Sequence, residues 1–265
     1  MSGNPSNQSH KKRKGGNKWQ KAQAQTSRPN IETGNSGVFV TCDKGKEKRC
    51  AVEVVDLFTQ YIEQPDAGGD AAGSDSDSDQ EDIEAQIRRE IEGLQPSTKE
   101  SSLFETVQFD LPCVIFVRFD KSIDPEKLVH QICLDAHANP DKKSSRYILR
   151  LTPAVSIRKT LSVDLEAFAR EILKPHFHSG GPPKKYAIRP VERGNKRFGR
   201  DVIIKTVADV VGPEHPVDLK NYDLIILVVV VQNVISMSVA GSDYDKLKAF
   251  NLAELYSPSA EPQGH

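Results

Sequence analysis

Cysteine is scarce in this sequence. Only four of the 265 residues are cysteine, at Cys42, Cys50, Cys113 and Cys133. None belongs to a C-x-x-C pair, the spacing that zinc sites and redox motifs commonly use. This argues against a zinc module and a disulfide framework, so we expect reduced, mostly buried thiols in an intracellular protein.

Long apolar segments are also missing. The N-terminus has no hydrophobic core of a secretory leader, and the longest apolar run, residues 223–231, is far too short to cross a bilayer. We therefore expect a protein without membrane contact. The hydrophobic content of 37% is low for a folded chain of this length, which predicts that part of it is disordered.

Motifs of catalysis and cofactor binding are absent as well. The segment 193–200 (RGNKRFGR) lacks the GK[ST] ending of a phosphate-binding loop. His176 and His178 have strand spacing but no third ligand close in sequence, so solvated loop histidines are favoured over a metal site. No serine or cysteine nucleophile stands beside a recognisable base. We predict no enzymatic activity, no cofactor, no metal and no small-molecule substrate.

Charge is present in abundance and is segregated. Residues 11–28 carry seven bases and no acid, whereas residues 66–84 carry eight acids and no base, within a net charge of −1. Such blocks favour polyelectrolyte partners. The cluster 11–14 (KKRK) fits a nuclear or nucleolar address or a nucleic-acid contact, and it fits a solubilising tail equally well.

The acidic block contains three serines that alternate with aspartates. Ser74, Ser76 and Ser78 suit an acid-directed kinase and are candidate phosphorylation sites. A constitutively acidic, solvated linker is an equally good interpretation.

The first half of the chain has the pattern of a small α/β sandwich. Residues 37–42, 103–110 and 112–119 are rich in β-formers and predict strands. Apolar residues at helical spacing predict helices over 46–63, from 81 onward and from Asp124-Pro125, where Asp is an N-cap and Pro the first helical residue.

The second half alternates strands and helices. Residues 146–152 alternate as a strand does, with Tyr147, Leu149 and Leu151 on one face and Ile148 and Arg150 on the other. A helix is expected around 165–173. A Gly/Pro/His loop over 174–183 then leads to a strand at 185–189 and a helix that begins near Arg200. The run 223–231 predicts a strand buried on both faces, followed by a strand at 234–240 and a final helix over 242–256.

The most cationic stretch lies between residues 184 and 205, where eight bases and two acids give a net charge of +6. A basic loop that leads into a helix N-terminus can hold anions, because free N–H groups and the helix dipole add to the side-chain charge. A solvated surface with internal ion pairs is the alternative. The glycines at 194 and 199, with Phe198 as a stacking group, favour RNA binding.

Several motifs in this region resemble a known family. The segments RYILRLTP (146–153), YAIRPVERGNKRFGRD (186–201), VDLKN (217–221), SVAG (238–241) and LKAFNLAEL (247–255) resemble the THUMP domain, and more narrowly the fungal THUMP-domain adaptors of tRNA cytidine acetylation. The resemblance covers residues 114–255, with weaker matching from 37. Where the family usually has an acid in a late strand, this chain has Val228, Val229 and Val230, which we expect to affect packing or hydrogen bonding at the strand edge.

The resemblance implies a tRNA-binding module preceded by a ferredoxin-like domain. It also implies a non-catalytic adaptor that presents leucine and serine tRNAs to a separate RNA cytidine acetyltransferase, which forms N4-acetylcytidine in the D-arm. Acetyl-CoA and ATP would then belong to that enzyme, and the expected location is the nucleus, in the nucleolus. A nucleolar or ribosome-assembly protein without tRNA selectivity, and an autonomous RNA-modifying enzyme, are the alternatives.

The predicted fold class is α/β, with a THUMP domain after a ferredoxin-like domain. The predicted segments are a disordered basic tail (1–35), a ferredoxin-like domain (36–125) with an acidic insert (65–81), a THUMP domain (126–241), a C-terminal helix (242–256) and a disordered tail (257–265). The predicted RNA-binding residues are Arg150, Lys184, Lys185, Arg189, Arg193, Lys196, Arg197 and Arg200.

Overall fold

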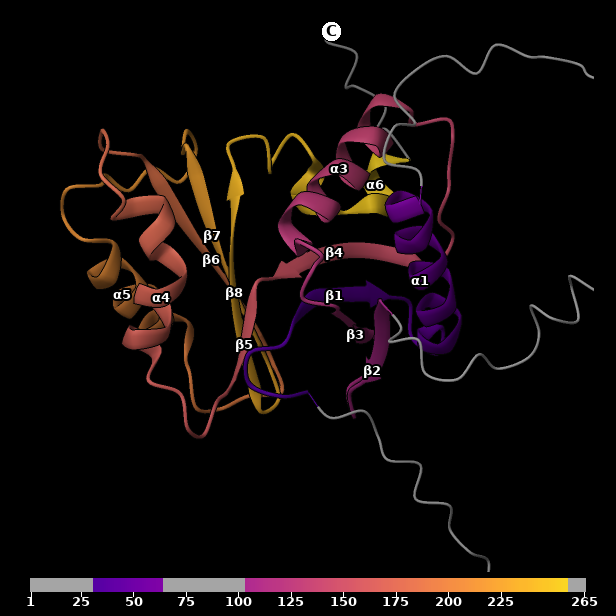
Figure 1. The fold of residues 1–265 in the computed structure, drawn as a ribbon, viewed down its shortest axis with the longest axis horizontal. Helices are drawn as coiled ribbons and strands as arrows, with labels where there is room; N and C mark the ends of the chain where they lie inside the picture. Colours follow the sequence, from indigo (N-terminus) through magenta and orange to yellow (C-terminus); the bar gives the residue numbers. More distant parts are fainter. Residues whose placement is uncertain (1–30, 64–102, 257–265) are drawn as a thin grey trace, which may run out of the picture.

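The computed structural model describes residues 31–63 and 103–256. The basic cluster at 11–14, the acidic insert, Ser74, Ser76, Ser78 and the helical pattern from residue 81 lie outside these ranges. Within them the chain forms two four-stranded sheets with helices, and Figure 1 places α1 and α3 on one side of the sheets and α4 and α5 on the other. The predicted α/β class is confirmed.

The first sheet is antiparallel, in the order β2-β3-β1-β4. Its elements are β1 (Ser36–Cys42), α1 (Glu47–Glu63), β2 (Phe104–Gln108), β3 (Val114–Phe119), α3 (Pro125–Ala138) and β4 (Ile148–Ala154). Helix α1 buries Cys50, Val54, Leu57 and Phe58, as its spacing predicted. The predicted start of α3 is confirmed: the Asp124 carboxylate accepts hydrogen bonds from the backbone N–H groups of Glu126 and Lys127.

The second sheet has the order β5-β8-β7-β6, and only β6 and β7 run parallel. Its elements are β5 (Ser156–Lys159), α4 (Leu165–Phe177), β6 (Tyr186–Arg193), α5 (Arg200–Val211), β7 (Leu224–Val231) and β8 (Val234–Gly241). Helices α4 and α5 share a hydrophobic core with one face of this sheet. The expectation of a strand buried on both faces is correct for β7.

The three valines that depart from the family pattern lie inside this strand. Val228 and Val230 are fully buried in the core beneath α4 and α5, and Val229 packs in the core between the sheets. Because β7 lies between β6 and β8, these valines affect packing in the interior of the sheet. The valines fill core volume in the middle of the sheet.

The two sheets share a core, and the chain passes from one to the other at Val155. Phe39 and Phe116 of the first sheet pack with Val229, Val231 and other residues of the second. Since α3 and β4 belong to the first sheet, the division between the sheets lies well after the predicted boundary between residues 125 and 126. Ile31 also joins this core, so the predicted disordered tail 1–35 extends too far at its C-terminal end.

Strand β4 does not alternate as its sequence predicted. Its pairing with β1 shifts register between Thr41 and Cys42, which pair with Arg150 and Ile148. Leu149 is left over, and such a bulge changes which side chains share a face. As a result Ile148 and Leu151 are buried in the same core, whereas the alternation put them on opposite faces.

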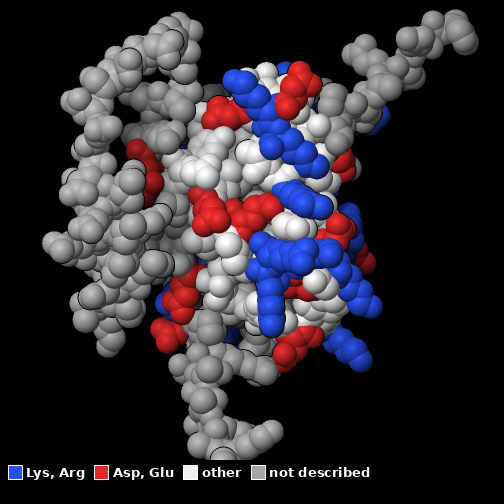
Figure 2. Space-filling view, turned by 90° about the vertical axis from the view of Figure 1, so that its right-hand side faces the viewer, with Lys and Arg blue, Asp and Glu red and all other residues white. Residues whose placement is uncertain are grey.

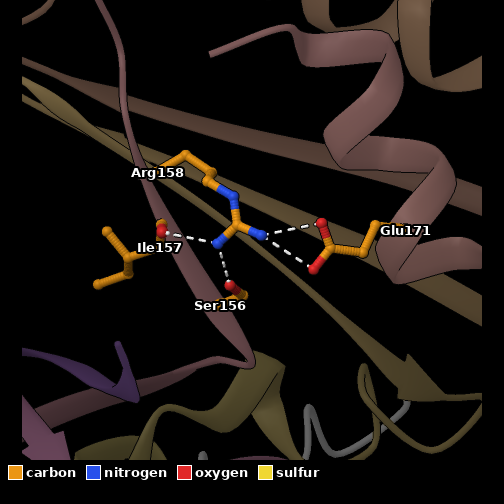
Figure 3. Close-up of polar contacts among 4 residues, drawn as sticks. All are labelled: Ser156, Ile157, Arg158 and Glu171. Carbon is orange, nitrogen blue, oxygen red and sulfur yellow. Dashed lines mark hydrogen bonds and ion pairs between the residues drawn. The ribbon is translucent and has the colours of Figure 1, made fainter. Parts of the chain in front are cut away.

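An arginine outside the predicted site fixes α4 to β5. Arg158 Nη2 donates to both carboxylate oxygens of Glu171, at 2.9 and 2.8 Å (Figure 3). Its Nη1 donates to Ser156 Oγ and to the Ile157 carbonyl. The guanidinium also lies 5.1 Å from the centre of the Phe168 ring. All of these partners are internal, so Arg158 has a structural role.

Two predicted boundaries were wrong. Helix α4 continues through Pro175 to Phe177, so the predicted loop 174–183 begins later. Pro175 has no backbone N–H to bond to the Glu171 carbonyl, yet the helix continues for two more residues. The predicted final helix is instead a short turn, η1 (Lys248–Phe250), with three residues in the left-handed region, and then α6 (Leu252–Leu255).

Candidate nucleic-acid interface

Strand β6 carries the predicted basic residues at both of its ends and in its middle. It is an edge strand, paired only with β7 among the described strands. A strand rises about 3.3 Å per residue, so the ends of this eight-residue strand lie about 23 Å apart. Lys184 and Lys185 precede it, whereas Lys196, Arg197 and Arg200 follow it, so the predicted residues do not form one cluster.

Asn195 shapes the loop between β6 and α5. Its side-chain oxygen accepts hydrogen bonds from the backbone N–H groups of Arg197 (2.7 Å) and Phe198 (3.1 Å), while its Nδ2 donates to the Gln232 carbonyl (2.5 Å). The preceding Gly194 has φ +64°, and a side chain there would crowd Leu111. The loop is thus fixed to the turn between β7 and β8 and lies close to Leu111.

The cations of this loop point away from the fold. Arg193, Lys196, Arg197 and Arg200 are exposed, and none of the four forms an ion pair with another described residue. Gly199 is the N-cap of α5 and supplies no side-chain hydrogen bond to its first turn. The free N–H groups and the dipole of α5 add to the positive charge, which favours a phosphate at this position.

Phe198 does not have the predicted stacking role. Its side chain is buried in the core beneath α4 and α5. The Arg197 guanidinium lies 5.7 Å from the centre of its ring. It anchors the loop from below. A nucleobase therefore has no access to this ring.

At the opposite end of β6 the lysines are held by internal partners. Lys184 Nζ donates to the His176 carbonyl at 2.9 Å, and Lys185 Nζ lies 3.2 Å from Asp218. The backbone N–H of Lys184 donates to Nδ1 of the buried His215, whose Nε2 lies 3.1 Å from the Phe177 carbonyl. Their charges are therefore less available to a ligand.

Arg189 and Arg150 come together in the middle, although they are far apart in sequence. Arg189 forms an ion pair with Asp245 at 3.2 Å and lies over the Tyr244 ring at 5.4 Å. Burial raises the pKa of Tyr244, and the nearby charges of Arg150 and Arg189 oppose that shift. Arg150 Nε is buried without a hydrogen-bond partner among the described residues.

The structure thus separates the predicted set into three groups. Four residues form the exposed loop cluster (Arg193, Lys196, Arg197 and Arg200), two flank Tyr244 (Arg150 and Arg189), and two are held at the far end of β6 (Lys184 and Lys185). Sequence reasoning missed Asn195 and Asp245. The Gly-Asn pair that opens the loop is a turn signal that could have identified Asn195; no sequence signal identifies Asp245 as the partner of Arg189.

Other chemistry has little support within residues 31–63 and 103–256. No group of three or more metal-ligating side chains gathers there. Burial, with the nearby Lys184, lowers the pKa of His176, and His178 ends α4. Every helix in these ranges is too short or too polar to span a bilayer. Cys42, Cys50 and Cys133 are buried free thiols, as predicted.

Comparisons with known proteins point in the same direction. Residues 162–240 match the family model of the THUMP domain. The chain is 36% identical to the uncharacterized protein C25H2.10c of Schizosaccharomyces pombe over 86% of its own length and 78% of that protein. It is 30% identical to THUMP domain-containing protein 1 of Mus musculus, over 89% and 68% of the two chains. It is also 30% identical to the tRNA acetyltransferase TAN1 of Saccharomyces cerevisiae, over 85% and 86%.

Proposed function

This chain belongs to the family of THUMP domain-containing proteins, and on that premise we propose that it is a non-catalytic tRNA-binding adaptor for tRNA acetylation. One observation carries the proposal: the cations of the loop cluster are exposed at the uncapped start of α5, inside the matched THUMP segment. Phosphate contacts of this kind give affinity and orientation without reading sequence. The similarity to a protein named for tRNA acetylation supplies the reaction.

The finer proposal concerns substrate and partner. The chain would present leucine and serine tRNAs to a separate RNA cytidine acetyltransferase, which forms N4-acetylcytidine in the D-arm. Acetyl-CoA and ATP would be bound by that enzyme, and the chain itself would need no cofactor. We place the complex in the nucleus, in the nucleolus, on the basic cluster at residues 11–14.

Reconstitution tests the adaptor role directly. Purified chain, leucine or serine tRNA, acetyl-CoA and ATP are combined with and without the RNA cytidine acetyltransferase, and nucleosides are measured by mass spectrometry. N4-acetylcytidine is expected only when chain and enzyme are both present. Product from the chain alone would make it an enzyme, and equal product from the acetyltransferase alone would remove the adaptor role.

Deletion of the gene tests the same function in cells. Leucine and serine tRNAs from the deletion strain are expected to lack N4-acetylcytidine. Persistence of the modification, together with co-purification of pre-ribosomal particles without tRNA enrichment, would instead favour a ribosome-assembly protein.

A further inference from the structure

A second cationic surface lies beside the first sheet, on α1 and the segment before β4, far along the chain from the loop cluster. Tyr147, just before β4, has two guanidinium groups over its ring: that of Arg49 at 5.8 Å and that of Arg146 at 5.5 Å from the ring centre. Arg49 Nη1 also donates to the Tyr147 hydroxyl at 3.3 Å. We name this group of one ring and two guanidinium groups the Tyr147 stack.

The stack is held in place by a carboxylate. Glu53 Oε1, one turn after Arg49 on α1, accepts hydrogen bonds from Ser145 Oγ and from the backbone N–H groups of Arg146 and Tyr147, at 2.8 to 2.9 Å. These bonds tie the segment before β4 to the helix. Tyr147 is half-buried while both arginines remain exposed, so the stack is fixed and accessible.

The stack borders a hollow of about 590 Å³ on α1. The lining combines two cations with two carboxylates and with apolar and polar side chains: Lys48, Arg49, Glu53, Asp56, Val52, Leu57, Gln60, Ser144 and Tyr147. Val52 is 64% exposed at its rim. A concave site with an apolar base and a few charged groups fits a small planar ligand group.

The surrounding surface is rich in exposed cations. Figure 2 turns the α1 side of the molecule toward the viewer and shows lysines and arginines gathered there, with carboxylates between them. The exposed cations lie in the segment that leads into α1, in α1 itself and in the segment before β4: Lys44, Lys46, Lys48, Arg49, Lys142, Lys143 and Arg146. None of these seven forms an ion pair with another described residue, whereas the carboxylates of Glu47 and Glu53 accept from backbone N–H groups.

We propose that this surface binds unpaired nucleotides of an RNA, with a base against the Tyr147 stack and phosphates on the surrounding cations. The inference rests on the proposed tRNA function and adds a second contact to it. Arginine planes and aromatic rings stack on nucleobases, and lysines and arginines bind the backbone. Charge alone would also attract an acidic protein, but the fixed planar stack beside a hollow matches a base better than a carboxylate.

The test uses full-length protein and two RNAs, a folded tRNA and a single-stranded oligonucleotide of twelve nucleotides. The variant Arg49→Gln/Arg146→Gln is compared with the matched control Arg170→Gln, an exposed arginine on α4 paired with Glu166. We expect the double variant to bind the oligonucleotide about tenfold more weakly and to lower the salt slope of tRNA binding by about 1.5. The control should bind both RNAs as the unaltered protein does.

A ring variant separates stacking from charge. Tyr147→Leu should weaken oligonucleotide binding about tenfold with little change in salt slope, because it removes the ring and no charge. Tyr147→Phe keeps the ring and should retain most of the binding. If Tyr147→Leu does not fold, the arginine variant above still tests the surface.

The outcomes distinguish this inference from the proposed function. If the arginine variant binds both RNAs normally while substitution of the loop cluster abolishes tRNA binding, the Tyr147 surface is refuted and the tRNA function stands. If the unaltered chain binds no tRNA, the proposed function is refuted, and the second RNA contact that rests on it is refuted as well. If the arginine variant keeps its RNA affinity but no longer binds purified RNA acetyltransferase, the surface is a protein interface and the RNA assignment is wrong.

Discussion

The two ends of β6 differ in whether their cations have partners within the fold. Where β6 ends and α5 begins, four cations extend into solvent without an ion pair to any described residue. Where β6 begins, its lysines are engaged by neighbours of the same fold. Four carboxylates lie near that end, namely Glu126, Asp218, Asp223 and Asp243.

This difference shows that a basic stretch of sequence is not a single surface. Lys185 and Arg197 look equivalent in the sequence, yet one faces Asp218 and the other faces solvent. An internal partner reduces the charge that a ligand can use, and an exposed ion pair is itself worth only about 0–1 kcal/mol. We therefore propose RNA binding at the α5 end and structural roles for the cations at the opposite end.

Neutralisation of the α5 end should have the largest effect. With Arg193, Lys196, Arg197 and Arg200 all changed to Gln, about four phosphate contacts are lost, and the salt slope of tRNA binding should shrink by about 3. Affinity at 0.1 M salt should fall by about two to three orders of magnitude. Filter binding or fluorescence anisotropy across a salt series measures both quantities.

The matched control neutralises the other end. Lys184→Gln/Lys185→Gln should leave the salt slope within about 0.5 of the unaltered value, because these lysines already have internal partners. Equal losses from both variants would contradict the assignment and would mean that RNA covers the whole length of β6.

The carboxylate-rich end should show an unusual pH dependence of stability. The Glu126 carboxylate accepts a hydrogen bond from the Val239 backbone N–H at 2.6 Å, and burial raises the pKa of Glu126 to about 7. A raised pKa means that the folded state binds the proton more tightly than the unfolded state. The contribution of this group is therefore complete below about pH 4.5 and is lost as the pH rises through about 7.

Glu126→Gln isolates this contribution, because the amide oxygen still accepts from Val239 and nothing titrates. Relative to the unaltered protein, the variant should gain about 3 kcal/mol in the free energy of unfolding between pH 4.5 and pH 8. Urea titrations at a series of pH values measure the difference. A difference that stays constant over this window would show that Glu126 is ionised throughout.

His215 should matter for stability and not for RNA binding. Its two ring nitrogens bridge the Lys184 N–H and the Phe177 carbonyl, and its side chain is buried. His215→Ala leaves both backbone groups without a partner and should lower the free energy of unfolding by about 2 kcal/mol. Thermal melting measures this loss. Below the transition the tRNA affinity should be unchanged, and a parallel loss of affinity would place this end of β6 in the RNA interface.

The sequence predicted the helices and strands around β6 better than the contacts that its basic residues make. The start of α5 follows from the glycine before Arg200 and the apolar spacing of Ile203, Val207 and Val210, which are local properties. The partner of Arg189 comes from a loop after β8, and the bulge in β4 depends on its pairing with β1. Contacts between segments distant in the chain leave no local pattern, so the division of the basic residues needed the structure.

The smallest expected effect is at Asp245, which pairs with Arg189 between the two ends of β6. Its carboxylate forms the ion pair with Arg189 and accepts a hydrogen bond from the Tyr222 hydroxyl at 2.8 Å. Asp245→Asn keeps an oxygen for Tyr222 while removing the charge that competes with phosphate for Arg189. We expect tRNA affinity to rise about two- to fourfold, the size of one exposed ion pair. Asp218→Asn releases Lys185 in the same manner. It should not raise affinity, because the proposed RNA contact lies at the α5 end of β6, away from Lys185. A rise for Asp218→Asn and none for Asp245→Asn, measured by anisotropy at fixed salt, would reverse the assignment of the two ends.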